Sequence, residues 1–498
     1  MSGLPTKARL SLAQSSRIPA AAQPLVDPRE LTVGMVHLGL GAFHRAHQAV
    51  YTERAMRASG TTQWGICAVA QRSRTVLDEL EPQDGLYTVV ERGPSTAFRV
   101  LAPIRELVVA ASQADLLTSR IAAPATHVVT VTVTEKGYRH DPVTRRLDLT
   151  DPDIRVDAAG RPPVTVVGQL VRAMQVRQRD NAGPLTVVCC DNLPSNGATL
   201  RGLVDDFCSL LPVADQSSLR SWIDESVAFP STVVDRITPA TTSADLGDVA
   251  NYLGLDDEGA VVTEPFSQWV LEDNFAGARP AWETAGAVFT ADATPYEALK
   301  LRLLNGSHSA LAYLGLLAGY EYIAEFIGVD GVTAFVRTLM DEAAATVSAP
   351  SSVDVDSYEQ QLLQRFANPG LRHRLGQIAI DGSQKLPPRL VATVRDARAT
   401  GVEPIANVLG IAAWMRYVTA GHDDAGRALV VDDPLASRIA EVVGSTGDPV
   451  TIVDRLLGVA EMFGDLADDV ALRDLLATAL TELTRGGALT ALRNARGA

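Results

Sequence analysis

The sequence is short of basic residues and of cysteine. Its 498 residues carry a formal charge of −15 and contain four cysteines. A nucleic-acid surface needs clustered lysine and arginine, so the acidic balance excludes a nucleic-acid partner. No C-x-x-C pair is present, and three of the cysteines lie in apolar runs typical of buried strands. We therefore expect reduced thiols at Cys67, Cys189, Cys190 and Cys208, most of them in the core.

Long apolar runs are missing as well. No stretch approaches the ~20 apolar residues of a membrane span, and residues 1–14 lack the apolar core of a signal peptide. We therefore expect a cytoplasmic protein with no membrane partner. The length of the chain predicts two or more domains.

The first half of the chain alternates between strand and helix patterns. Strand patterns occupy residues 33–38, 64–70, 87–91, 98–104, 127–134 and 185–190, and helix patterns lie near 43–57 and 164–177. This alternation predicts an α/β fold with a doubly wound, Rossmann-like sheet. Beyond Asp292 the helical segments are long and occupy residues 296–324, 332–344, 358–366 and 408–419. We predict a dinucleotide-binding domain over 1–290 and a mainly α-helical substrate and catalytic domain over 291–498.

A glycine-rich turn follows the first predicted strand. Gly39 and Gly41 stand where a pyrophosphate approaches backbone amides in dinucleotide-binding folds. The third glycine of the G-x-G-x-x-G motif is replaced by His44. We predict cofactor contacts at Gly39, Gly41, Phe43 and His44, with an ordinary turn and a packing role for His44 as the alternatives. No cysteine or carboxylate cluster accompanies His44 and His47, so no metal site is predicted.

The second predicted strand lacks the acid that bonds the adenosine ribose in NAD enzymes. Arg72 and Arg74 follow this strand, and the first acid is Asp78. Either arginine suits a 2′-phosphate, and both also suit a solvated surface. We predict NAD(H) as the cofactor, with NADP(H) possible.

One segment of the second half combines Glu297, Lys300, Asn305 and His308 with several leucines. On an ideal helix the four polar groups share less than half of the circumference, which predicts a helix buried nearly all round. Burying an unpaired lysine costs several kcal/mol, but burial also lowers the pKa of an amine toward that of a general base. The pattern indicates a catalytic lysine, with a structural Lys–Glu pair as the alternative.

Two of these groups lie far apart along an ideal helix. Lys300 and His308 are separated by about 12 Å along the axis. A shared site therefore requires the long lysine side chain, an extended substrate or a bend near Gly306.

Six blocks spread over both halves of the chain share one resemblance. They are residues 39–47, Thr-Glu-Lys-Gly-Tyr at 134–138, Cys-Asp-Asn-Leu-Pro at 190–194, Val-Asp-Arg-Ile-Thr-Pro at 234–239, residues 268–280, and Lys-x4-Asn-x2-His at 300–308. Together they resemble the polyol-specific long-chain dehydrogenase family, which contains mannitol 2-dehydrogenases and fructuronate reductases. The resemblance implies metal-independent hydride transfer between a nicotinamide and a secondary alcohol.

The resemblance also implies catalytic roles. Lys300 is expected to be the general acid/base, and Asn192 and Asn305 are expected to hold the carbonyl or alkoxide oxygen. Glu297 is expected to relay the proton of the lysine to water. His308 is expected to contact substrate hydroxyls.

The substrate is expected to be a sugar acid or a polyol. The resemblance implies that Asp235 also contacts substrate hydroxyls. Lys136 and the blocks at 368–374 and 381–387 resemble fructuronate reductases, and Lys136 or Lys385 would pair with the carboxylate of a hexonate. We predict D-mannonate/D-fructuronate as the substrate pair, with D-mannitol/D-fructose or another hexitol or pentitol as the alternative. A monomer or weak oligomer is expected.

Two hypotheses from other classes compete with this one. Tyr296-x-x-x-Lys300 is also the tyrosine–lysine pair of short-chain dehydrogenases, in which the tyrosine is the acid/base. Those enzymes are about half this length and carry the pair in the cofactor domain. A nucleotide-binding sensor without catalysis is the non-enzymatic hypothesis, and the intact Lys300, Asn305 and His308 speak against it.

Overall fold

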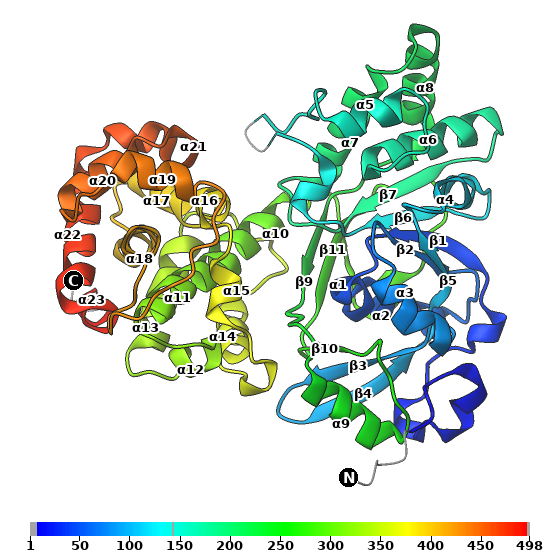
Figure 1. Cartoon of the computed structure of the whole chain (residues 1–498), viewed down its shortest axis with the longest axis horizontal. Helices are drawn as coiled ribbons and strands as arrows, with labels where there is room; N and C mark the ends of the chain where they lie inside the picture. Colours follow the sequence, from blue (N-terminus) through cyan, green and yellow to red (C-terminus); the bar gives the residue numbers. More distant parts are fainter. Residues whose placement is uncertain (1–6, 142–143, 496–498) are drawn as a thin grey trace. The chain divides into compact units, whose positions relative to one another are not determined.

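The computed structural model describes residues 7–141 and 144–495. The chain divides into two compact units, Met1–Ala293 (unit 1) and Thr294–Ala498 (unit 2), and Figure 1 labels the elements of each. Within the described ranges, no helix combines the length and the apolar character needed to cross a membrane.

Unit 1 is built on a parallel sheet with the strand order β5-β2-β1-β6-β7-β8. Its strands are β1 (Val33–Leu38), β2 (Gly65–Ala70), β5 (Ile104–Val109), β6 (Val128–Val131), β7 (Leu185–Cys189) and β8 (Val227–Ala228). The chain runs outward from β1 through β2 to β5 and then returns to β6 on the other side of β1. This reversal is a topological switch point, where ligands bind at the carboxyl ends of the strands.

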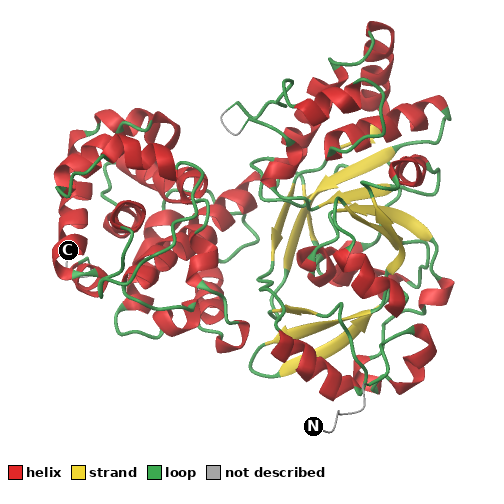
Figure 2. Cartoon of the chain, viewed as in Figure 1, coloured by secondary structure: helices red, strands yellow, loops and turns green. Residues whose placement is uncertain are grey.

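Helices lie on both faces of this sheet (Figure 2). The helices of unit 1 are α1 (Ala42–Ala46), α2 (Gln48–Ser59), α3 (Thr75–Leu80), α4 (Ala114–Ala122), α5 (Pro152–Ala158), α6 (Val166–Arg179), α7 (Asn196–Cys208), α8 (Val213–Ser226) and α9 (Ser243–Leu253), of which α9 packs on a smaller sheet described below. Val36 and Leu38 of β1 belong to one apolar cluster and Met35 to another. Burial on both faces explains why the strands are continuous apolar runs, and the predicted Rossmann-like fold is confirmed. The four cysteines are unpaired and buried, as predicted.

Two smaller sheets complete unit 1, with the strand orders β10-β3-β4 and β12-β11-β9. Their strands are β3 (Tyr87–Arg92), β4 (Thr96–Leu101), β9 (Thr232–Asp235), β10 (Val261–Thr263), β11 (Gln268–Glu272) and β12 (Val288–Thr290). The prediction of one strand over 98–104 is wrong, because β4 pairs with β3 while β5 pairs with β2 in the large sheet. Pro103 lies between β4 and β5, where its missing N–H ends one ladder before the next begins.

Unit 2 is helical, as predicted. Its helices are α10 (Thr294–Leu299), α11 (Gly306–Leu317), α12 (Ile323–Ile327), α13 (Val332–Ala344), α14 (Val355–Phe366), α15 (Leu375–Ala379), α16 (Gly382–Leu386), α17 (Ala392–Ala399), α18 (Ile405–Ala420), α19 (Ala436–Val443), α20 (Pro449–Leu457), α21 (Ala460–Phe463), α22 (Val470–Gly486) and α23 (Ala488–Asn494). Helix α18 runs through the middle of the unit (Figure 1) and is buried from Ala406 to Tyr417. It packs against α11 and α22.

Two segments of unit 2 are π-helices: η7 (Lys300–Asn305) and η9 (Pro387–Val391). The predicted continuous helical segment over 296–324 is therefore wrong, because η7 separates α10 from α11 and a break precedes α12. The remaining short turns are 3-10 helices: η1 (Leu12–Arg17), η2 (Ala20–Ala22), η3 (Pro28–Glu30), η4 (Glu81–Gln83), η5 (Glu135–Tyr138), η6 (Trp282–Ala285), η8 (Pro369–Leu371) and η10 (Gly464–Asp468). Segments of π-helix are rare and frequently lie at functional sites.

Candidate active site

The glycine turn lies at the carboxyl end of β1, beside the switch point. Gly39 has φ +106°, and a Cβ atom there would lie 2.0 Å from the backbone oxygen of Thr132. Only glycine permits this approach between β1 and the loop after β6. Gly41 has φ −120°, and a Cβ there would meet only the Gly39 oxygen at 3.7 Å. The space beside Gly41 is therefore open to a ligand.

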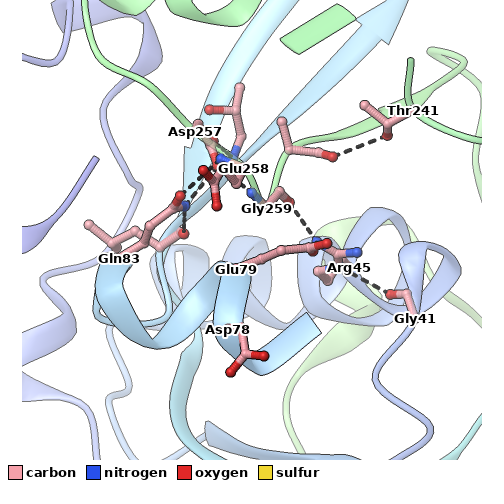
Figure 3. A network of polar contacts seen from close by, with 12 residues as sticks. Gly41, Arg45, Asp78, Glu79, Gln83, Thr241, Asp257, Glu258 and Gly259 are labelled. Carbon is pink, nitrogen blue, oxygen red and sulfur yellow. Dashed lines mark hydrogen bonds and ion pairs between the residues drawn. The ribbon is translucent and has the colours of Figure 1, made fainter. Parts of the chain in front are cut away.

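A buried arginine holds the first turn of α1. The Nε atom of Arg45 donates to the Gly41 oxygen (3.3 Å), and its Nη1 donates to the Gly259 oxygen (2.6 Å). Gln83 and Asp257 extend this network on the opposite side (2.7 Å; Figure 3). The guanidinium thus fixes the turn against the segment that precedes β10. Sequence reasoning missed Arg45, although it lies inside the 39–47 block.

His44 is a buried packing group. Its ring stacks on that of His37, with the ring centroids 3.4 Å apart, and His37 hydrogen-bonds the hydroxyls of Thr130 (2.8 Å) and Thr132 (2.9 Å). Burial lowers the pKa of His37 to about 3 and that of His44 well below its usual value. Both rings are neutral at physiological pH. This placement favours the packing alternative for His44 over a phosphate contact through its ring. The neighbouring Phe43 is only partly buried, so its side chain remains accessible to a ligand.

The two arginines after β2 differ in their surroundings. Arg74 pairs with Asp78 (3.0 Å) and with Glu81. Arg72 is exposed, and none of the ion pairs in the described part of the chain includes it. Exposed ion pairs contribute at most about 1 kcal/mol, but they occupy the guanidinium of Arg74. Arg72 is therefore the better candidate for a 2′-phosphate contact.

Asn192 lies in the loop after β7, and this loop is tied to the loop after β6. The carboxylate of Asp191 accepts hydrogen bonds from the hydroxyl of Tyr138 (2.6 Å). It also accepts from the backbone N–H groups of Val133 (2.9 Å) and Thr134 (3.2 Å). Thr134 has φ +70°, a conformation that costs about 1–3 kcal/mol outside glycine. The Asp191 bonds hold this strained loop and connect it to the loop after β7. Lys136 on the first loop and Asn192 on the second are both exposed.

Asp235 ends β9 and is buried. The next residue, Arg236, donates to the oxygen of Ala46 at the end of α1 and to Glu91 (2.6 Å). The side-chain amide of Asn196 donates to the oxygen of Asp191 and to the first residue of β9 (both 3.0 Å). These bonds connect the Asp235 strand to α1 and to the Asn192 loop. Sequence reasoning missed Arg236 and Asn196, because each resembles an ordinary surface residue in isolation.

Unit 2 brings together the other predicted catalytic side chains. Lys300 and Asn305 lie on η7 and His308 on the first turn of α11, and each is 8% exposed. Glu297 lies on α10 and is partly buried. The N–H of Gly306 donates to the oxygen of residue 301, five positions earlier. The assumption of an ideal helix is wrong here, because a π-turn winds more residues into each turn and so shortens the axial distance from Lys300 to His308.

The ring of His308 is buried and neutral. It packs against Phe366 (ring centroids 4.7 Å apart) and, edge-on, against His373 (5.5 Å). Burial lowers the pKa of His308 well below its usual value, and the neighbouring His373, two arginines and Lys300 lower it further. Nε2 of His308 is buried, and no residue within the described ranges hydrogen-bonds it. A neutral ring with a vacant nitrogen can bond a substrate hydroxyl.

The remaining predicted residues have other surroundings. The Lys385 amine donates to the Ile378 oxygen (3.4 Å), which satisfies a backbone group. The hydroxyl of Tyr296 is hydrogen-bonded to the hydroxyl of Ser352 (2.8 Å). Over residues 7–141 and 144–495, no three histidine, cysteine or acidic side chains form a group able to hold a metal ion.

Comparisons with known proteins agree with the blocks found in the sequence. Residues 33–284 match the mannitol dehydrogenase Rossmann domain, and residues 292–484 match the mannitol dehydrogenase C-terminal domain. The chain belongs to the mannitol dehydrogenase family. The predicted family and the predicted oxidoreductase class are both confirmed.

Relatives with different substrate names show similar identities. The chain is 41% identical to the D-mannonate oxidoreductase of Escherichia coli, over 90% of this chain and 92% of the relative. It is 39% identical to the mannitol 2-dehydrogenase of Pyrenophora tritici-repentis, over 92% and 80%. The mannitol 2-dehydrogenase of Pseudomonas fluorescens, solved in a ternary complex with NAD and D-mannitol, has a TM-score of 0.89 at 35% identity and covers 98% of this chain and 99% of its own.

The glycine turn generates a test with a matched pair of variants. Gly41→Ala should leave the unfolding temperature unchanged and weaken dinucleotide binding about tenfold or more, because the new methyl group meets only the ligand space. Gly39→Ala should destabilise unit 1 by about 2–4 kcal/mol, since it adds a clash and a strained φ. Calorimetric unfolding and titration with NADH measure both effects. Unchanged NADH binding by Gly41→Ala would contradict the site.

The arginines after β2 generate a second test. Arg72→Gln should lower kcat/KM with NADP about tenfold, because a charge-assisted bond is lost, and should change kcat/KM with NAD by less than about twofold. Arg74→Gln is the matched control, since its guanidinium is already paired, and it should change neither value. A wild-type preference for NAD of several hundredfold would refute tolerance of NADP.

Proposed function

We propose that this protein is an NAD(H)-dependent, metal-independent dehydrogenase that interconverts D-mannonate and D-fructuronate. The proposal is supported by one observation above all: a buried lysine, an amide and a neutral histidine lie together on η7 and α11. The D-mannonate oxidoreductase relative supports the sugar acid. The likeness to the mannitol 2-dehydrogenase complex supports D-mannitol/D-fructose as the second candidate.

The residues of unit 1 fit a dinucleotide. The close approach at Gly39 and the open space at Gly41 suit a pyrophosphate. No acid stands at the end of β2 to bond the ribose, and the exposed Arg72 occupies that place. When bound, NAD supplies the hydride acceptor.

The proton is handled by side chains of the protein. In oxidation, the neutral amine of Lys300 removes the hydroxyl proton of the substrate, and Glu297 on the preceding turn passes it toward water. The amide N–H groups of Asn305 and Asn192 donate to the oxygen as it becomes a carbonyl, and losing one such donor costs roughly 3 kcal/mol. His308 holds a neighbouring hydroxyl through Nε2. Asp235 is assigned to a further hydroxyl.

A panel of hexonates and hexitols tests the substrate. Fructuronate should be reduced at least about tenfold more efficiently than fructose, because a charge-assisted hydrogen bond contributes ~1.5–3 kcal/mol. The measurement is kcat/KM for each compound with NADH, followed by the oxidative direction with mannonate and mannitol. Equal use of fructose and fructuronate would favour the mannitol 2-dehydrogenase alternative. No turnover of any polyol or sugar acid would favour a sensor.

Variants of Lys300 and Tyr296 distinguish two kinds of dehydrogenase. Lys300→Ala should lower kcat about 10²–10⁴-fold, as is typical when a general base is lost, with little effect on NADH binding. Tyr296→Phe should cost less than about tenfold, because its hydroxyl is bonded to Ser352. A nearly inactive Tyr296→Phe enzyme beside an active Lys300→Ala enzyme would reverse the assignment.

The scarcity of lysine offers a direct check of the same assignment. The sequence has only the lysines Lys7, Lys136, Lys300 and Lys385, so ¹³C-methylation of the amines gives few NMR signals, and the Lys300→Ala variant identifies one of them. The rate of oxidation should rise over the same pH range in which the Lys300 signal titrates. Separate pH ranges would argue against Lys300 as the base.

A further inference from the structure

One buried tyrosine of unit 1 hydrogen-bonds the residue that precedes Asn192. Tyr138 ends η5 and has no exposed surface. Its hydroxyl lies 2.6 Å from a carboxylate oxygen of Asp191 and 3.1 Å from Sγ of Cys189. Cys189 is the last residue of β7, so the tyrosine reaches from the loop after β6 to the end of the neighbouring strand. The proposed mechanism gives this hydroxyl no role.

The direction of these bonds follows from the chemistry of the three groups. An ionised carboxylate only accepts hydrogen bonds, so the single hydroxyl proton of Tyr138 is donated to Asp191. The hydroxyl oxygen then accepts the proton of the Cys189 thiol. Burial raises the pKa of the Cys189 thiol to about 12 and that of Tyr138 well above its usual value, so both groups keep their protons at physiological pH. The bond to the carboxylate is charge-assisted and is therefore the stronger of the two.

The carboxylate of Asp191 joins the loops after β6 and β7. It accepts from the backbone N–H groups of Val133 (2.9 Å) and Thr134 (3.2 Å) as well as from the tyrosine. Burial raises the pKa of Asp191, and these three hydrogen bonds oppose the rise. The charge of the buried carboxylate is thus stabilised by its donors, and Tyr138 supplies the shortest of the three bonds.

The main chain beside Asn192 is anchored as well. The side-chain amide of Asn196 donates to the backbone oxygen of Asp191 (3.0 Å) and accepts from the N–H of Thr232 (2.8 Å). The hydroxyl of Thr232 in turn donates to the backbone oxygen of Cys189 (2.7 Å). Asn192 therefore follows a residue whose side chain and backbone oxygen are both held. These anchors limit where the backbone of Asn192 can lie.

We propose that Tyr138 is a positioning residue for the reaction: through Asp191 it holds Asn192 where its amide meets the oxygen of the substrate. The inference rests on the proposed dehydrogenase function, which assigns this amide to the oxygen as it becomes a carbonyl. A donor stabilises such a transition state best when it is already in place, because no reorganisation is then needed during the reaction. Tyr138 has no exposed surface, so it acts on the substrate only through Asp191.

Removal of one hydroxyl tests the inference. Tyr138→Phe should lower kcat and kcat/KM together by about ten- to a hundredfold, because a misplacement of about 1 Å can cost about a hundredfold in rate. KM and the dissociation constant of NADH should change by less than about twofold, since the donor acts mainly in the transition state. The measurement uses NADH with the better substrate of fructuronate and fructose. Tyr417→Phe is the matched control: it removes another buried tyrosine hydroxyl, which donates to the oxygen of Val430 (2.7 Å), and should leave kcat unchanged.

A double-mutant cycle separates positioning from a merely structural role. If Tyr138 acts through Asn192, Tyr138→Phe should lower kcat by less than about twofold in an Asn192→Ala background. Equal fold losses in both backgrounds would overturn the inference, because the tyrosine would then act elsewhere. An Asn192→Ala enzyme with full kcat would overturn it too, since the amide would not hold the oxygen. Loss of the folded state in Tyr138→Phe would make the tyrosine structural and would also overturn it.

Hydrogen exchange tests the positioning without turnover. In Tyr138→Phe the backbone amides of residues 131–138 and 190–196 should exchange faster than in the wild type, whereas those of α13 should not change. Unchanged exchange in both segments would overturn the inference even if kcat falls. Faster exchange in a protein that turns over no sugar acid or polyol would refute the proposed function and still support the hold of Tyr138 on the loop, which separates the two failures.

Discussion

The burial of polar side chains in an apolar helical unit is the constraint on which the structure of unit 2 depends. Lys300, Asn305 and His308 are each 8% exposed inside a core of aliphatic and aromatic residues, and each buried polar group or charge has to be compensated by hydrogen bonds or by a partner of opposite charge. A protonated His308 would add a further charge beside Lys300 and two arginines. Its depressed pKa is therefore a consequence of the same crowding, and neutrality makes its ring a hydrogen-bonding group.

The π-turn at η7 solves the geometric side of this problem. On an α-helix the polar groups would follow one another along the axis, about 12 Å apart at the extremes. Bonds of the i→i+5 type compress this spacing, and η9 packs against η7. The irregular backbone thus concentrates the polar groups without breaking the surrounding core.

Unit 1 meets a different constraint, the precise placement of loops at the carboxyl ends of parallel strands. Gly39 lets the loop after β6 approach β1, and Asp191 ties that loop to the loop after β7. Asn196 continues the connection to β9. The strained φ of Thr134 persists because these bonds over-determine its loop. These bonds connect the segments that carry the predicted substrate contacts of unit 1: Lys136 and Asn192, which are exposed, and Asp235, which is buried.

Much of the fold could be predicted from the sequence, whereas the site was predicted less completely. The bounds 33–38 and 332–344 coincide with β1 and α13, because a short apolar run marks β1 and apolar residues at helical spacing mark α13. The short strands from β8 to β12 gave too few residues to show a period. The π-turns were missed because a 3.6-residue period was assumed. Arg45, Asn196 and Arg236 act through partners distant in the sequence, which no local pattern reveals.

The sparing use of lysine in this chain supports the role proposed for Lys300. The sequence has 44 lysine and arginine residues, and only Lys7, Lys136, Lys300 and Lys385 are lysines. Arginine does not give up its proton in proteins, whereas a buried lysine amine can. A chain that uses arginine at nearly every basic position therefore places a lysine at the one buried position where the proposed chemistry must move a proton.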